Sequence, residues 1–216
     1  MTKLEIIKKT IEYVKSKSEG EGSGHDWWHI FRVWNNAKLI SKGENSDQFI
    51  VELGALLHDI ADYKFNKGDE EIGGKVSKEW LKDLNVEDKD IVAVVHIVNN
   101  VSFKSEANNK IKSLEGKIVQ DADRLDAIGA IGIARCFAYG GYKGHSIYDP
   151  NIKPNLNMTK EEYKSQKGTQ INHFYEKLLL LKDLMNTQTA KEIAKERHEF
   201  MEKYLEEFFA EWEDRK

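Results

Sequence analysis

A histidine and two aspartates stand at the end of an apolar stretch in the first third of the chain. His58 and Asp59 are adjacent, and Asp62 follows one helical turn later. Burying an imidazole and carboxylates beside a leucine-rich core costs free energy unless a partner compensates them. A metal ion can compensate all of them at once. The pattern therefore predicts a metal site at His58–Asp59, with the remaining ligands elsewhere in the chain.

Further nitrogen and oxygen donors stand on two other predicted helices. His29 belongs to a helix with an aromatic inner face, and three acids adjoin an apolar tract, namely Asp121, Asp123 and Asp126. A site with two histidines, two carboxylates and no cysteine favours one divalent ion of the six-coordinate kind over structural zinc, with Mn²⁺ foremost and Mg²⁺, Fe²⁺, Co²⁺ or Ni²⁺ as alternatives. Positions left for water and a substrate oxygen make this a layout for metal-assisted hydrolysis.

Composition excludes several classes of protein. The 216 residues carry a net charge of −4, so no sequence-wide basic field indicates a nucleic-acid partner. The single cysteine, Cys136, allows no intrachain disulfide and fits a reducing compartment. No apolar run approaches the length of a membrane span, and the first residues begin an amphipathic pattern rather than a signal peptide. We therefore expect a cytoplasmic protein without membrane or nucleic-acid partners.

Apolar residues recur at helical spacing, and no strand-like alternation is long enough to predict a sheet. The fold class expected is all-α. Asp26 is the expected N-cap of the second helix and Asn85 that of the fifth, and the last helix has a broad apolar face that either packs internally or forms a homodimer. The predicted helices cover roughly 2–18, 26–41, 47–60, 70–83, 87–100, 114–126, 170–185 and 187–214.

Two tracts in the second half of the chain differ from these helices in composition. Residues 127–138 are rich in Gly, Ala and Ile, which permit close helix approach, so we expect this tract to form the most buried helix. Residues 139–169 are polar and contain both prolines of the chain. A structureless segment of that length inside a compact domain is usually a lid or a mobile loop.

Three motifs together resemble the HD-domain phosphohydrolases, whose ordered pattern is H…HD…D. They are GHDWWHIFRV at 24–33, LHDIAD at 57–62 and QDADRL at 120–125. The match extends from about residue 20 to 145, and the whole length resembles small bacterial HD hydrolases that act on nucleotides. The resemblance implies one HD domain over residues 1–216 with C-terminal helices at about 170–214. It also implies four metal ligands, namely His29, His58, Asp59 and Asp123.

The resemblance also suggests roles for residues around the metal. In related alarmone hydrolases, a Glu three residues after the HD aspartate helps to activate water, and Asp62 holds that position here with a carboxylate one methylene shorter. Lys64 is expected to neutralise phosphate charge in the transition state. Lys143 and His145 are candidates for closing over the phosphates. For Lys64, Lys143 and His145, an ordinary solvated loop position is the default interpretation.

Two further histidines are candidate substrate contacts. His25 either binds substrate or packs beside the glycine-rich turn, and His96 is either a phosphate contact or a core histidine. Because two-metal HD proteins use additional histidines in the region of His96, where this chain has only one, a single metal is expected.

These observations favour an enzyme that hydrolyses a phosphate ester or anhydride of a small-molecule nucleotide, with nucleoside triphosphate pyrophosphohydrolysis as one form of that reaction. A nucleotide monophosphatase and a phosphodiesterase are the alternatives within enzymes. A nucleotide sensor with slow turnover is an alternative of another class, although a pure binder has no need of Asp62.

Overall fold

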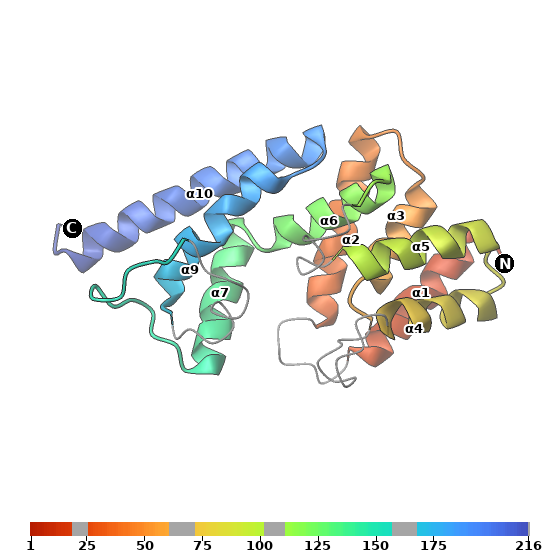
Figure 1. The fold of residues 1–216 in the computed structure, drawn as a ribbon, viewed down its shortest axis with the longest axis horizontal. Helices are drawn as coiled ribbons and strands as arrows, with labels where there is room; N and C mark the ends of the chain where they lie inside the picture. The colour runs from red at the N-terminus through yellow and green to blue at the C-terminus, as the bar shows by residue number, and fades with distance from the viewer. Residues whose placement is uncertain (19–25, 61–71, 102–110, 157–167, 216) are drawn as a thin grey trace. The chain divides into compact units, whose positions relative to one another are not determined.

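The structure is a computed structural model that describes residues 1–18, 26–60, 72–101, 111–156 and 168–215 (Figure 1). The regular elements within these ranges are helices, which confirms the all-α class. The chain divides into two compact units, Met1–Asp123 and Arg124–Lys216, and the boundary falls in the last turn of a helix. A single domain over the whole chain stays a prediction. Among the described residues, no helix combines the length and apolarity that crossing a bilayer requires.

The first unit is built around one short, buried helix. This helix, α3, packs against α1, α2 and α5, and α4 lies beside α5. Each residue of α3 from Leu53 to Leu57 is buried, so α3 forms the centre of the unit's apolar core. The helices are α1 (Lys3–Lys17), α2 (Trp27–Gly43), α3 (Gln48–Leu57), α4 (Ile72–Asp83), α5 (Asp88–Asn100) and α6 (Leu114–Asp126), the last of which crosses the unit boundary.

Gly54 lets two neighbouring helices approach α3 closely. A Cβ placed at this position would lie 3.2 Å from two side-chain carbons of Ile97 on α5 and 3.3 Å from Val119 Cγ2 on α6. Such separations are tighter than ordinary van der Waals contact, so a side chain here would have to displace the side chains of Ile97 and Val119. The packing at Gly54 therefore holds α6 against α3, one turn before the end of α3.

The ends of two helices test the predicted caps. Asp26 is the N-cap of α2, where its Oδ1 accepts a hydrogen bond from the backbone N–H of His29 at 2.9 Å, which confirms that prediction. The prediction that Asn85 caps the fifth helix is wrong. Asn85 has φ 55° in the turn after α4, and the N-cap of α5 is Glu87. Asparagine tolerates the left-handed region, so its place is explained by the exit from α4 rather than by the entry into α5.

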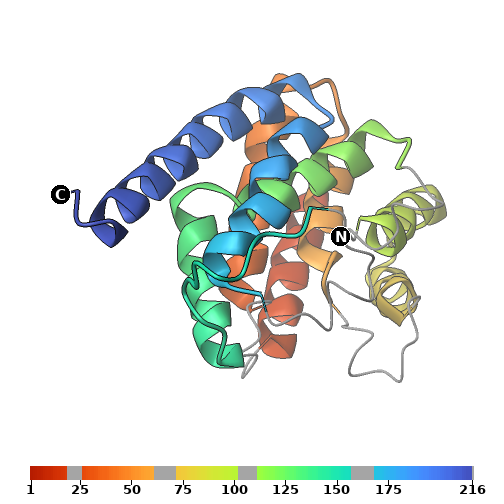
Figure 2. The ribbon, with the colours of Figure 1, turned by 60° about the vertical axis from the view of Figure 1, so that its left-hand side comes forward.

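The second unit packs α7 against α9 and the long α10 (Figure 2). The helix predicted at 170–185 is divided at Lys177, whose φ of −146° leaves the helical region, into α9 and a 3₁₀ helix. Phe174 and Tyr204 stack in the core of this unit with ring centroids 5.8 Å apart. Its elements are α7 (Gly129–Lys143), α9 (Gln170–Glu176), the 3₁₀ helix η2 (Leu178–Leu184) and α10 (Gln188–Trp212).

Two expectations about the middle of the chain need correction. The tract 127–138 does not form the most buried helix, because Ala130, Ile131 and Ala134 of α7 are exposed whereas α3 is enclosed. The segment predicted as a loop from residue 139 begins only at Gly144, whose left-handed φ of 69° ends α7. Side-chain periodicity could not show this, because the last turn of α7 is made of residues typical of loops.

The described part of that loop, residues 144–156, is fastened to its own unit. The backbone N–H groups of Gln170 and Ile171 donate to the carbonyls of Ser146 and Ile147, both at 3.0 Å. The Tyr148 ring packs edge-on against Trp212 at a centroid distance of 5.0 Å. Paired backbone and a packed aromatic ring are not typical of a mobile lid.

Two glycines of α7 provide a matched test of its packing. We expect Gly132→Ala to destabilise the protein by about 1–3 kcal/mol, because the new Cβ would lie 2.3 Å from the backbone oxygen of Ala127. Gly141→Ala is the control, because nothing lies within 4 Å of its Cβ, and it should be neutral or stabilise by up to about 1 kcal/mol. Urea unfolding of both variants checks the difference. Equal effects would contradict the described packing of Gly132.

Candidate metal centre

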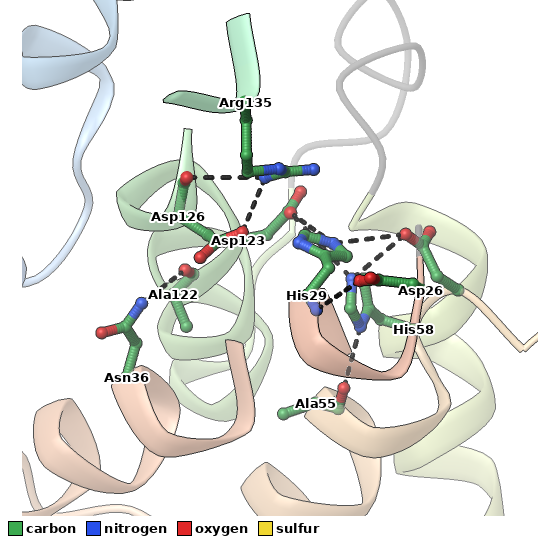
Figure 3. A network of polar contacts seen from close by, with 10 residues as sticks. Asp26, His29, Asn36, Ala55, His58, Ala122, Asp123, Asp126 and Arg135 are labelled. Carbon is green, nitrogen blue, oxygen red and sulfur yellow. Dashed lines mark hydrogen bonds and ion pairs between the residues drawn. The ribbon is translucent and has the colours of Figure 1, made fainter. Parts of the chain in front are cut away.

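Two imidazoles and two carboxylates converge in the first unit (Figure 3). His29 comes from the first turn of α2, His58 and Asp59 follow α3 directly, and Asp123 comes from the last turns of α6. His29 Nε2 lies 3.5 Å from Asp59 Oδ2 and 3.5 Å from Asp123 Oδ1. His58 Nε2 lies 3.4 Å and 4.0 Å from the same two oxygens. Separate helices thus bring both imidazole nitrogens close to one oxygen of Asp59 and one oxygen of Asp123.

The local structure holds the backbone of His29 and the imidazole of His58. The backbone N–H of His29 donates to Oδ1 of the Asp26 cap, which fixes the first turn of α2. His58 Nδ1 lies 2.8 Å from the carbonyl oxygen of Ala55, one turn earlier. A carbonyl only accepts hydrogen bonds, so Nδ1 of a neutral His58 carries the hydrogen and Nε2 presents its lone pair to the cluster. An imidazole held in this way has the tautomer and orientation that a metal ligand needs.

The burial of these groups fits a bound cation. His58 Nε2 is buried without a hydrogen-bond partner among the described residues, although burying a polar atom in that state is costly. Both imidazole side chains are 1% exposed, whereas the carboxylates of Asp59 and Asp123 are 31% and 35% exposed. Ligands at about 2.1 Å from one ion lie roughly 3–4 Å from one another. The distances from the imidazole nitrogens to the carboxylate oxygens, 3.4–4.0 Å, fall in that range. A cation would satisfy the nitrogen and remain reachable from the carboxylate side.

The three acids of the predicted cluster on α6 have different surroundings. Asp123 is the one that lies beside His29. Asp121 is fully buried. The Asp126 carboxylate pairs at 2.6 Å with Nη1 of Arg135, and Asp126 and Arg135 both belong to the second unit. The geometry therefore favours Asp123 as the donor, as the family resemblance implied. Its role as a metal ligand stays a prediction.

Several predicted catalytic and substrate-binding residues lie outside the described parts of the chain. These are His25, Asp62 and Lys64. His96 lies on the exposed face of α5, with Nδ1 3.4 Å from the amide nitrogen of Asn100, so the interpretation as a core histidine is wrong. Its role as a substrate contact stays a prediction.

Two predicted phosphate contacts, Lys143 and His145, belong to the second unit. Lys143 is the exposed last residue of α7, and its Nζ lies 5.1 Å from the ring centroid of Tyr142. His145 Nδ1 lies 3.2 Å from the amide nitrogen of Gln170. Nearby, burial and the charges of Lys177 and His145 lower the pKa of His173 to about 4, so His173 is neutral at physiological pH and supplies no positive charge. Substrate contact by Lys143 or His145 stays a prediction.

Two groups near the cluster were not predicted from the sequence. One is the Ala55 carbonyl, because a backbone oxygen leaves no trace in residue type. The other is Asn36 of α2, whose Nδ2 donates to the Ala122 carbonyl of α6 at 3.4 Å. The only signal in the sequence was spacing, since Asn36 follows His29 by two helical turns and lies on the same helix face.

Comparison with known proteins identifies the family. A model of the HD domain matches residues 27–128, a range that contains all four converging side chains. YpgQ of Bacillus subtilis is 39% identical over 209 residues, which cover 95% of this chain and 93% of YpgQ. The chain belongs to the HD superfamily. HD-domain proteins are metal-dependent hydrolases that bind divalent ions, so this HD protein is a metal-dependent hydrolase, as the motifs predicted.

Solved structures agree with this assignment. An HD-superfamily hydrolase from Bacillus thuringiensis is 48% identical, with a TM-score of 0.79 over 98% of this chain and 99% of that one. Bacillus subtilis YpgQ in complex with ADP is 38% identical, with a TM-score of 0.73 over 94% and 95% of the two chains. The described HD fold is therefore shared over nearly the full length of these proteins.

Proposed function

We propose that this HD hydrolase cleaves a phosphate ester or anhydride bond of a nucleotide, and that it releases pyrophosphate from nucleoside triphosphates. The observation that carries the proposal is the cluster of the two buried imidazoles with the partly exposed Asp59, beside which the partly exposed Asp123 also lies. Such a donor set suits a divalent ion that also binds phosphoryl oxygen. The ADP complex of YpgQ supports a nucleotide as the ligand.

In this proposal His29, His58, Asp59 and Asp123 hold one divalent ion, with Mn²⁺ foremost. The ion, when bound, lowers the pKa of a water ligand and polarises a phosphoryl oxygen. The Ala55 carbonyl orients the His58 imidazole, and the Asp26 cap fixes the helical turn that carries His29. Asp62 takes the proton from the attacking water, and Lys64 neutralises charge on the phosphates. The reaction consumes one water and yields a nucleoside monophosphate and pyrophosphate.

Product analysis tests the proposal. The metal-free protein is reconstituted with Mn²⁺ and incubated with nucleoside mono-, di- and triphosphates in ¹⁸O-labelled water. We expect pyrophosphate from triphosphates and no orthophosphate from monophosphates, and the position of ¹⁸O shows which phosphorus the water attacks. Orthophosphate from monophosphates would instead support a nucleotidase. Bound Mn²⁺ and bound nucleotide without product would support the sensor.

A further inference from the structure

Asn36 connects the helix that carries one proposed ligand to the backbone of another. It lies two turns after His29, and at roughly 100° per residue the two side chains share one face of α2. Its amide donates to the carbonyl of Ala122 at 3.4 Å (Figure 3). That oxygen belongs to the peptide unit whose nitrogen is the backbone nitrogen of Asp123. One face of α2 therefore reaches both Asp123 Oδ1, through His29, and the peptide that precedes Asp123.

We infer that Asn36 is a positioning residue for Asp123. A peptide unit is planar, so a hydrogen bond to its oxygen restrains the whole plane and the Cα that follows. The side chain of Asp123 has few rotatable bonds, so the backbone position largely decides where its oxygen lies relative to His29 Nε2, now 3.5 Å away. The inference rests on the proposed role of Asp123 as a metal ligand.

A different polar contact lies at the opposite end of α6 and joins it to the start of α3. Glu115 Oε1 accepts from the backbone N–H of Asp47, the N-cap of α3, at 3.1 Å. Val119 packs in the middle of α6, near Gly54. The bond between Glu115 and Asp47 is far along α6 from Asp123, whereas Asn36 contacts the turn that carries Asp123. Loss of its amide should leave the packing of α6 on α3 in place while it loosens the carboxylate.

A double-mutant cycle separates positioning from a merely structural contact. Dissociation constants for Mn²⁺ are measured by electron paramagnetic resonance for the wild type, Asn36→Ala, Asp123→Ala and the double variant. We expect Asn36→Ala to weaken Mn²⁺ binding about tenfold in the wild type, the loss typical of a group that orients a ligand. In the Asp123→Ala background the same change should alter binding by less than about twofold.

Asn35→Ala is the matched control, since Asn35 is the neighbouring residue of the same type and is exposed on α2. It should bind Mn²⁺ within about twofold of the wild type. Unchanged binding in Asn36→Ala, or an equal loss with and without Asp123, overturns the inference. If Asn36→Ala does not fold, the same cycle is run with Asn36→Gln, which fills the site and displaces the amide. If Asp123→Ala alone leaves Mn²⁺ affinity unchanged, the ligand assignment fails, and this inference fails with it.

Discussion

His58→Ala is expected to lose the bound metal and the hydrolytic activity together. The Nε2 atom of His58 is buried. Because Nδ1 of His58 donates to the Ala55 carbonyl, the lone pair of Nε2 is directed at the cluster. Changing groups that only orient a ligand weakens metal binding about 10–100-fold, so loss of the ligand itself should weaken Mn²⁺ binding by more than about 100-fold. Mn²⁺ titration and initial rates over a range of Mn²⁺ concentrations measure both effects on one preparation.

The control is a histidine whose polar contacts do not involve the cluster. His198 lies on α10, where its Nε2 is 3.3 Å from Glu202 Oε1 and 3.5 Å from Lys182 Nζ. His198→Ala should retain Mn²⁺ affinity within about twofold. Thermal unfolding adds an independent readout, since Mn²⁺ at 100 times its dissociation constant stabilises a native state by about 2.7 kcal/mol. The wild type and His198→Ala should show this stabilisation, and its persistence in His58→Ala would contradict the assignment.

Helix periodicity predicted most of the first unit because it records which residues are buried locally. The helix expected at 2–18 is observed at Lys3–Lys17, and the one expected at 87–100 at Asp88–Asn100. The position of His58 and Asp59 at the end of a buried helix was also predictable, because an apolar run stops there. Burial patterns locate a helix and its inner face, and this information was enough to place His58 and Asp59 together.

Contacts between helices were less predictable. Asp123 and Asp126 are one turn apart on α6, so spacing alone gave both a place on the same side of the helix. Their surroundings differ because Arg135, from a later helix, pairs with Asp126. The support from Asn36 likewise depends on which carbonyl of α6 comes within reach of α2. Contacts of this kind depend on how the helices pack, which cannot be predicted directly from the order of residues in the sequence.

Asp62→Asn is expected to keep the metal and lose rate. Asp62 follows Asp59 by three residues, in the position of the acid that activates water in the related alarmone hydrolases. An asparagine has nearly the same shape as an aspartate but cannot take a proton. Removing a general base typically costs about 10²–10⁴ in rate, so kcat should fall in that range while the Mn²⁺ dissociation constant stays within about threefold. Single-turnover rates with saturating Mn²⁺ isolate the chemical step.

Two companion variants make this result specific to proton transfer. Asp59→Asn removes a proposed ligand and should lose Mn²⁺ and rate together, in contrast to Asp62→Asn. Asp62→Glu keeps a carboxylate and extends it by one methylene, so it should retain more rate than Asp62→Asn, and its shortfall from the wild type measures how strictly the site fixes the distance to water. Loss of Mn²⁺ binding in Asp62→Asn would show that Asp62 is a ligand. In that case the water must be activated by a different group, because the carboxylate would already be committed to the metal.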